Sequence, residues 1–269
     1  FIPIVIGISI NRINVVIDKS IASTLPIGSI SWLNYANDII QLVLGIFITA
    51  IVTVLFPIIS QEYNRENIES LKSAMKRGTN TVFSIVIPAM VILVTLSKPI
   101  VRLLFERGEF GATATLMTSG ALTYYALGLG SMAMVLILTK IHYAMHDSIT
   151  PMISSIVGVL ANLVLNIILS RPMGVNGLAL ATSISTTLVT ILLIRDLNKR
   201  VKVIDIHREF KGFLKYVIAT AIMAVVVLFF YNILAKILVA TMVGGILHLI
   251  LTIGIGITVF IGVNKFHYI

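Results

Sequence analysis

Charge and cysteine are what this sequence lacks. Only 12% of its 269 residues are charged, whereas about a quarter are charged in an average soluble domain. Hydrophobic residues make up 58% of the chain and its mean hydropathy is +1.04, so polar side chains are too few to cover a soluble domain of this size. The absence of cysteine excludes a disulfide framework, a thiol nucleophile and a cysteine-based metal site. The composition therefore indicates an integral membrane protein.

Segments of alternating polar and apolar residues, which would indicate membrane-spanning strands, are absent as well. The chain has long apolar runs instead, and about 20 apolar residues make a helix long enough to cross a bilayer. The sequence therefore predicts an all-α integral membrane protein with about eight transmembrane helices. Their expected ranges are 2–22, 33–60, 79–104, 115–143, 151–170, 175–195, 212–235 and 242–263.

Residues 61–77 differ from the apolar runs because they are rich in charge. Ile68, Leu71 and Met75 recur on one helical face, opposite the charged side chains. This pattern is typical of an amphipathic helix that lies flat at the membrane interface, with its basic residues near lipid headgroups. Pro57, a short distance before it, is expected to end the second transmembrane helix.

Basic residues outnumber acidic ones, and the formal charge is +9. Thirteen of the twenty basic residues lie in 61–78, 140–150, 195–215 and the tail after 263, and six lie in the alternate loops. Because cytoplasmic loops are enriched in Lys and Arg, these loops and both chain ends are predicted to be cytoplasmic. A nucleic-acid partner is not expected. The chain opens inside an apolar segment with neither Met nor a signal peptide, so it is expected to begin partway through a longer protein.

Polar residues on the first two expected helices are the candidates for a functional site. Charged groups inside a bilayer are costly, and they usually face a cavity or pair with each other. The candidates are Asn11, Arg12, Asn14 and Asp18 on the first helix and Asn37, Asp38 and Gln41 on the second. The polar stripe of the second helix includes Asn34 and is expected to continue to Thr49 and Thr53. The alternative is a polar seam that hydrogen-bonds a neighbouring helix, with Asp18 near the interface.

The fifth and sixth expected helices also carry polar faces. These faces are formed by Ser155, Gly158, Asn162 and Asn166, and by the hydroxyl residues between 182 and 190. Packing and hydrogen bonding between helices are the default interpretation, and a second cavity wall is the alternative. In the fourth helix, Gly128 and Gly130 predict a place where a neighbouring helix can approach closely.

His142, His146 and Asp147 suggest a metal site, because a spacing of four places the two histidines on one helical face. The sequence favours the absence of a metal, since these residues lie at an aqueous helix end and no third converging ligand is evident. No nucleophile and base stand together, and the acidic residues are scattered. The sequence therefore predicts no metal, no cofactor and no enzymatic activity.

Several motifs resemble one family in the order in which they occur. They are Asp18-Lys-Ser-Ile-Ala-Ser-Thr-Leu-Pro26, Gly28-Ser-Ile-Ser31, Leu33-Asn-Tyr-Ala-Asn37, Leu104-Phe-Glu-Arg-Gly-Glu-Phe110 and the stretch from Asp147 to Pro151. Together they are similar to the MurJ/MviN family of lipid II flippases, in the multidrug/oligosaccharidyl-lipid/polysaccharide exporter superfamily. The resemblance runs from the start of the chain to about residue 195, and the remaining residues agree with it in hydropathy only.

The resemblance implies a transporter with two six-helix lobes and two further helices. On that template, residues 1–197 are the second lobe, and residues 198–269 are a basic cytoplasmic loop plus the two additional helices. The family moves the undecaprenyl-diphosphate-linked peptidoglycan precursor, lipid II, across the bacterial cytoplasmic membrane by alternating access. Expected partners are this precursor, membrane lipids and the missing first lobe of the same protein. The alternatives are an exporter of another lipid-linked saccharide or a drug, and a non-transporting module that binds cell-wall intermediates.

The chain departs from the family at two positions of the expected cavity. The cavity of the family is cationic, which suits a diphosphate in a low-dielectric region. Asp38 stands where the family typically has Arg or Lys, and Arg12 stands where it commonly has Gln. The hypothesis is that Arg12 and Asp38 form a buried pair, or that Arg12 takes over the diphosphate contact. The alternative is that Asp38 lies unpaired in water near the outer surface.

Overall fold

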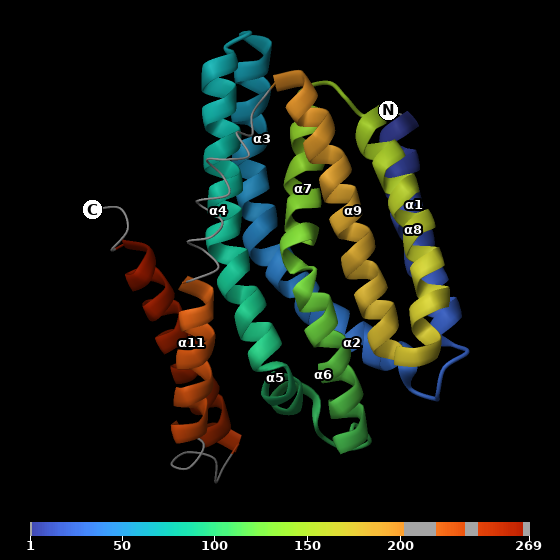
Figure 1. Cartoon of the computed structure of the whole chain (residues 1–269), viewed down its shortest axis with the longest axis vertical. Helices are drawn as coiled ribbons and strands as arrows, with labels where there is room; N and C mark the ends of the chain where they lie inside the picture. The colour runs from blue at the N-terminus through green and yellow to red at the C-terminus, as the bar shows by residue number, and fades with distance from the viewer. Residues whose placement is uncertain (1, 202–218, 235–241, 266–269) are drawn as a thin grey trace.

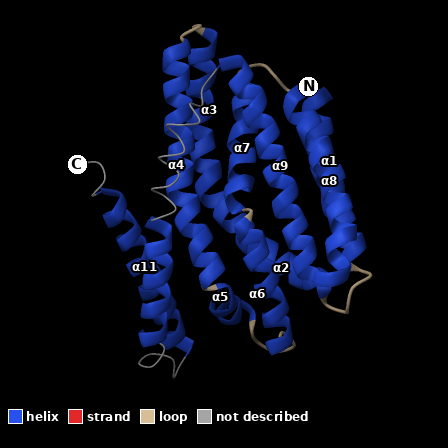
Figure 2. Cartoon of the chain, viewed as in Figure 1, coloured by secondary structure: helices blue, strands red, loops and turns tan. Residues whose placement is uncertain are grey.

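The computed structural model describes residues 2–201, 219–234 and 242–265, and the elements in these ranges are helices (Figure 2). The prediction of an all-α protein is confirmed. Residues 202–218, which hold most of the predicted basic loop, lie outside the described ranges. In chain order the elements are α1 (Ile2–Ala22), α2 (Ser29–Val43), the π-helical turn η1 (Leu44–Ile48), α3 (Thr49–Asn64), α4 (Ile68–Thr95), α5 (Ser97–Phe105), α6 (Ala112–Leu127), α7 (Leu129–Ala144), α8 (Ile149–Met173), α9 (Val175–Val201), a helix at Ala219–Leu234, and α11 (Met242–Lys265).

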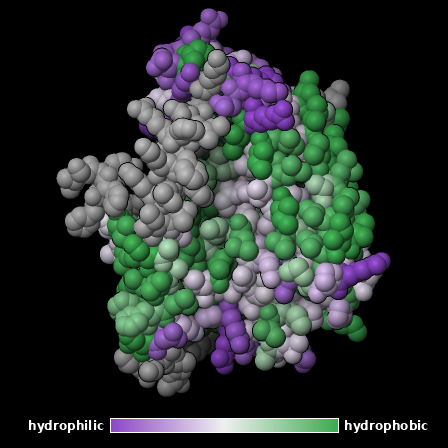
Figure 3. Space-filling model, in the orientation of Figure 1, coloured by the Kyte–Doolittle hydropathy of each residue, from purple (hydrophilic) through white to green (hydrophobic). Residues whose placement is uncertain are grey.

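Among the described residues, five helices are long and apolar enough to cross a membrane, and α6 and α7 make a sixth span if they are counted together. Each of the eight predicted ranges overlaps at least one described helix. α1 falls outside the five because it carries Arg12, Asp18 and Lys19, and the helix at Ala219–Leu234 falls outside because it is short. Figure 3 shows hydrophobic side chains over the middle of one face and hydrophilic ones gathered at the end that carries the α3–α4 turn.

The helix α9 is the centre of the bundle that holds the polar faces. It packs against α8, α6 and α7, while α8 contacts α1 and α2 contacts α6 (Figure 1). α6 and α7 are bent by 49° at Gly128, where a Cβ atom would lie 2.7 Å from Ser183 Cα of α9. The Ser183 hydroxyl donates to the backbone oxygen of Tyr124 at 2.7 Å across the same contact. The close approach predicted at Gly128 is confirmed, whereas Gly130 faces open space.

The connection between α3 and α4 differs from the predicted one. α3 continues through Pro57, and α4 begins after a short turn, so 61–77 joins two long helices and is not a separate interfacial helix. Leu71 and Met75 lie in the protein core at 0% and 1% exposure. The predicted interfacial helix and the predicted helix end at Pro57 are therefore both wrong. An amphipathic pattern does not say whether protein or lipid headgroups cover its apolar face. A proline, in turn, is tolerated inside membrane helices.

Two helices beyond α9 form a smaller packed group. The helix at Ala219–Leu234 and α11 bury Met223 and Phe260 in a cluster that includes Leu96 at the end of α4. α11 also contacts α5. This group lies beside α4, on the opposite side of the bundle from α1 and α8 (Figure 1). The group therefore does not cover the polar faces of α1, α2, α8 and α9, which are directed towards one another.

Candidate functional site

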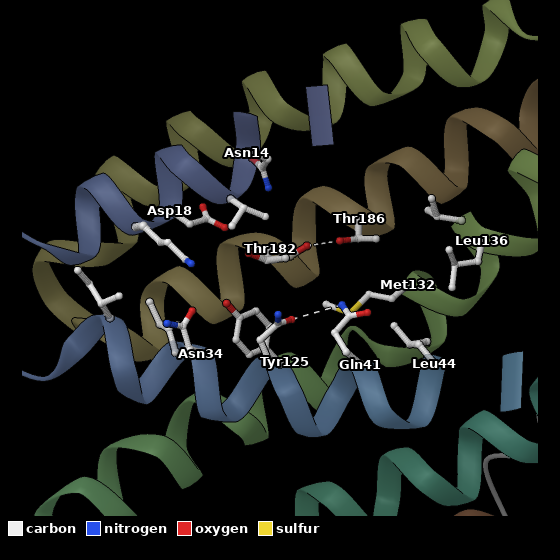
Figure 4. Close-up of a pocket in the computed structure, with 16 residues that line it drawn as sticks. Asn14, Asp18, Asn34, Gln41, Leu44, Tyr125, Met132, Leu136, Thr182 and Thr186 are labelled. Atoms are coloured by element: carbon white, nitrogen blue, oxygen red, sulfur yellow. Dashed lines mark hydrogen bonds between the residues drawn. The ribbon is translucent and has the colours of Figure 1, made fainter. Parts of the chain in front are cut away.

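A cavity of about 330 Å³ lies where α1, α2, α6, α7 and α9 meet (Figure 4). Leu33, Leu44 and Met132 form part of an apolar wall. The polar lining residues are Asn14, Asp18, Lys19, Asn34, Asn37, Gln41, Tyr125, Thr182 and Thr186. A concave site with apolar walls and a few converging polar groups is the usual form of a site for a small molecule or a headgroup.

Helical spacing brings the polar side chains of α1 and α2 to the cavity. Asn14 and Asp18 are four residues apart on α1, so both point the same way (Figure 4). Asn34, Asn37 and Gln41 follow one another at spacings of three and four on α2 and share a face in the same manner. Gln41 Nε2 donates to Asn37 Oδ1 at 3.5 Å. These two faces form opposite walls of the cavity.

The polar stripe of α2 ends where the π-helical turn η1 begins. Leu44, the first residue of η1, still lines the cavity, but Thr49 and Thr53 do not. Thr53 instead donates its hydroxyl hydrogen to the backbone oxygen of Thr49 at 2.8 Å. A π-helical turn takes up one extra residue, so the helices on either side of it keep nearly the orientation they would have without that residue. Thr49 and Thr53 are exposed and lie outside this cavity, so the continuation of the stripe towards a partner or a wet cavity stays a prediction.

Two buried amides of α8 hold Asp18 from behind the cavity. Asn166 Nδ2 donates to Asp18 Oδ1 at 2.6 Å. The Asn162 amide, in the orientation that satisfies both of its polar atoms, donates to the same oxygen at 2.9 Å and to Asn14 Oδ1 at 3.0 Å. Both asparagines are 0% exposed, and buried polar groups need such partners. The packing interpretation is thus confirmed for Asn162 and Asn166, whereas Ser155 and Gly158 of the same helix line a smaller cavity of about 80 Å³.

The hydroxyl residues of α9 divide between the two interpretations that the sequence left open. Thr182 and Thr186 line the cavity, and the Thr186 hydroxyl donates to the backbone oxygen of Thr182 (Figure 4). Thr190 instead donates to the backbone oxygen of Ser131 on α7 at 3.1 Å. One end of α9 therefore forms a cavity wall, and the following turns connect it to α7.

Among the described residues, Lys19 is the one basic residue that lines the cavity. Within the described part of the chain, its ammonium group makes no ion pair or hydrogen bond, whereas the neighbouring Asp18 is engaged by Asn166. Lys19 is exposed, and an ammonium group at the edge of a cavity that amides and hydroxyls also line can bind an anionic group such as a phosphate. The sequence analysis did not include Lys19 among the site candidates, because a lysine near a helix end is as typical of the membrane interface as of a binding site.

The structure brings some of the seven predicted site residues together and separates others. Those that line the cavity are Asn14, Asp18, Asn37 and Gln41. Arg12 and Asp38 are exposed and lie outside it. The side chain of Asn11 is outside the described part of the structure.

The buried pair hypothesised between Arg12 and Asp38 is not present in the described residues. Both side chains are exposed, and none of the ion pairs found in the described ranges joins them. Asp38 immediately follows Asn37, and one residue is a rotation of about 100° around a helix. The rotation turns Asp38 out of the cavity face, and Arg12 is likewise off the face shared by Asn14 and Asp18. Any part that they have in substrate contact stays a prediction.

A second polar cluster lies where α7 ends and α8 begins. Arg200 of α9 bridges two carboxylates, with Nη2 2.8 Å from Asp147 Oδ2 and Nε 2.7 Å from Asp196 Oδ2. His142 Nε2 lies 3.4 Å from the same Asp196 oxygen. Burial acts to raise the pKa of Asp147, but hydrogen bonds from Thr150 and the charge of Arg200 outweigh it and hold that pKa below its ordinary value.

Three residues of this cluster have the chemistry of metal ligands. The ligand atoms of His142, Asp147 and Asp196 all lie within 4.8 Å of one another. Asp196 is the third converging residue that the sequence did not reveal, because it comes from a helix much further along the chain. His146, which the sequence grouped with them, is turned away and lies 3.3 Å from Asn64 Oδ1.

Comparison with known proteins points to one family. A family model described as "Lipid II flippase MurJ" matches residues 1–251. The chain is 37% identical to a probable lipid II flippase MurJ of Vibrio cholerae, over 73% of this chain and 38% of that protein. It is 36% identical to a probable lipid II flippase MurJ of Haemophilus influenzae, over 74% of this chain and 40% of that protein. The chain thus spans about two fifths of the length of the curated relatives it matches.

A solved structure leads to the same family. The chain superposes on a structure described as lipid II flippase MurJ in an inward closed conformation, with a TM-score of 0.79 and 29% sequence identity. The superposition covers 97% of this chain and 52% of the solved chain. The fold described above is therefore about half of a larger helical architecture in that relative.

Proposed function

Because the chain belongs to the MurJ family of lipid II flippases, we propose that it forms part of a transporter for an undecaprenyl-diphosphate-linked peptidoglycan precursor. The chain is a multi-pass protein of a bacterial membrane. In this proposal residues 1–197 are the second lobe, the helices after residue 198 are accessory, and a first lobe of the same protein completes the transport path. The distribution of basic residues supports a cytoplasmic membrane location with both ends of the chain inside.

The observation that carries the proposal is the cavity with Lys19 among its amides. A diphosphate that crosses a region of low dielectric constant needs paired positive charge and hydrogen-bond donors. Lys19 supplies the charge, and Asn34 and Gln41 supply amide donors from the opposite wall. Asp18 accepts its hydrogen bond from Asn166, and no ion pair joins it to Lys19 in the described residues. In this arrangement the wall of the second lobe presents one available cation to the substrate.

The transport step needs no covalent chemistry. Two lobes that rock about a central site expose it to each side of the membrane in turn. The cavity described here lies within one lobe, and the exposed Arg12 and Asp38 lie on the same two helices that carry its polar walls. We place these two residues on the surface that faces the first lobe, where they contact either that lobe or the substrate passing between the lobes.

The test is complementation of a strain depleted of its lipid II flippase by the full-length gene. Lys19→Ala is expected to abolish growth, because a lost charge-assisted contact of about 1.5–3 kcal/mol is about a 10- to 100-fold loss of substrate binding. Lys19→Arg is expected to restore growth. Lys98→Ala is the matched control, since Lys98 is an exposed lysine on α5 that does not line the cavity.

Two outcomes would contradict the proposal at different levels. Normal growth with Lys19→Ala, at wild-type protein levels, would remove Lys19 from the substrate path but leave the family function in place. Failure of the wild-type gene itself, with the protein present in the membrane, would favour the alternative that the transporter exports another lipid-linked saccharide or a drug.

A further inference from the structure

The cluster at the α7–α8 end contains a buried ring nitrogen without a hydrogen-bond partner in the described residues. His142 is 1% exposed, and its Nδ1 lies 2.8 Å from the backbone oxygen of Leu138. A carbonyl oxygen only accepts, so Nδ1 carries the hydrogen, and Nε2 is the ring nitrogen that can offer a lone pair to a metal ion. Nε2 has no hydrogen-bond partner in the described residues and faces Asp196 Oδ2 at 3.4 Å. These two atoms face each other favourably only when a proton on Nε2 or a metal ion lies between them.

Asp147 and Asp196 each place a carboxylate oxygen within 4.8 Å of this ring nitrogen. Asp147 Oδ1 accepts hydrogen bonds from the backbone N–H groups of Ile149 and Thr150, each at 3.0 Å. These bonds fix the carboxylate at the start of α8 and leave Oδ2 directed towards the cluster. A histidine whose second ring nitrogen donates to a backbone carbonyl, as His142 does to Leu138, has the orientation that metal-binding histidines usually have.

We propose that His142 Nε2, Asp147 Oδ2 and Asp196 Oδ2 bind a divalent transition-metal ion such as Zn²⁺. One imidazole and two carboxylates suit Zn²⁺, whereas Mg²⁺ prefers oxygen ligands alone. Ligand atoms of a tetrahedral zinc ion at about 2.0–2.2 Å lie about 3.4 Å apart, which is the separation already present between His142 and Asp196. Asp147 closes the remaining gap by a small rotation, and water completes the coordination.

Arg200 is the competitor of the metal at this site. Its guanidinium group contacts both carboxylates at 2.7 and 2.8 Å, so it supplies the positive charge when no metal is bound. Its side chain is 45% exposed, which lets it swing into solvent. Because Arg200 can move into solvent, a divalent ion with three ligands can take its place between the carboxylates. The site lies outside the cavity and does not depend on the transport proposal.

The experiment is a zinc titration of the purified protein in detergent, in competition with a fluorescent zinc indicator. Wild-type protein is expected to take up one ion that excess Mg²⁺ does not displace. His142→Gln and Asp196→Asn are each expected to weaken binding at least about tenfold, because a ligand is lost. Arg200→Gln is expected to strengthen binding, since the competing cation is gone. His146→Gln is the matched control, because His146 is exposed and lies next to Asn64 instead of the cluster.

Folding is monitored by thermal unfolding with and without zinc. The ion is expected to raise the melting temperature of the wild type and of His146→Gln, and to leave that of Asp196→Asn unchanged. If His142→Gln does not fold, Asp196→Asn still tests the site. Asp196 is 29% exposed, so its substitution leaves the buried core unchanged. Equal zinc affinity of the wild type and the two ligand variants, or no gain with Arg200→Gln, would overturn the proposal.

Discussion

The cavity and the cluster at the α7–α8 end are both polar regions, but they leave opposite hydrogen-bonding groups unused. Near the beginning of α9, the cavity has an ammonium group, Lys19, without a partner in the described residues. Near the end of α9, the cluster has the ring nitrogen Nε2 of His142, which has no hydrogen-bond partner in the described residues and faces a carboxylate. An unused donor attracts an anion and an unused acceptor attracts a cation. One helix therefore serves two sites for ligands of opposite charge.

The two regions also differ in how complete they are within this chain. Every residue of the cluster comes from α7, the following turn and α9, so its ligand set is closed. The cavity is one wall of a transport path if the chain covers only half of a flippase, as the 52% coverage of the solved relative supports. The cluster should therefore function in the isolated chain, and the cavity should not.

The largest expected effect follows from this difference. Residues 1–269 purified alone and placed in liposomes are expected to bind zinc but to flip a fluorescent lipid-linked precursor no faster than protein-free liposomes. The reason is that half of the proposed path is absent while the cluster is intact. Flipping by the isolated chain would break the comparison, because the cavity would then be a complete site.

A smaller effect is expected at the contact that holds α9 against the bend between α6 and α7. Gly128→Ala places a Cβ atom 2.7 Å from Ser183 Cα, and such overpacking costs about 1–3 kcal/mol. Gly130→Ala is the control two residues away, where a Cβ atom has open space. Thermal unfolding in detergent measures both variants. Equal melting temperatures for Gly128→Ala and Gly130→Ala would show that α9 is not fixed at Gly128. The cavity and the cluster would then be positioned independently of each other.

A comparable or slightly smaller loss is expected from the amide that holds Asp18. Asn166→Leu removes the donor 2.6 Å from Asp18 Oδ1, and an unsatisfied buried acceptor costs about 1–3 kcal/mol. Ser170→Ala serves as the control, because Ser170 is also buried on α8 and its hydroxyl donates no hydrogen bond in the described residues. Denaturant unfolding compares them. A stability of Asn166→Leu equal to that of Ser170→Ala would mean that Asn162 alone satisfies Asp18.

The smallest effect is expected from Arg12 and Asp38, because both are exposed and no ion pair joins them in the described ranges. Arg12→Gln and Asp38→Arg are each expected to change stability by less than about 0.5 kcal/mol, and their effects on flippase complementation should add. Recovery of function in the double variant beyond additivity would restore the pairing hypothesis. It would also extend the cavity to the exposed faces of α1 and α2.

Helical periodicity made much of the fold and part of the site predictable. The spacing that put Asn14 with Asp18, and Asn37 with Gln41, is a local property of one helix, and the structure places all four at the cavity. The prediction failed where a residue's neighbour depended on tertiary packing. The amphipathic segment 61–77 was assigned to the interface although Leu71 and Met75 of its apolar face are buried in the protein core.

The two residues most important for the proposals were not recognised for the same reason. Lys19 matches the pattern of an interfacial lysine, and only the positions of α2 and α9 show that it lines a cavity. Asp196 lies far from His142 in the sequence, and only the packing of α7 on α9 brings them within 3.4 Å. Periodicity identifies the faces of a helix, but long-range contacts decide what those faces meet.

The π-helical turn at Leu44–Ile48 separates the part of the second span that lines the cavity from the part that does not. Upstream of it, Asn37 and Gln41 point into the cavity, and downstream of it Thr49 and Thr53 lie outside the cavity. A π-helical turn takes up one extra residue, so deleting one residue of the turn, such as Gly45, is expected to restore a regular α-helix and leave the residues on either side on their present faces. The same deletion within α2 or α3 would instead rotate every following residue of the helix by about 100°.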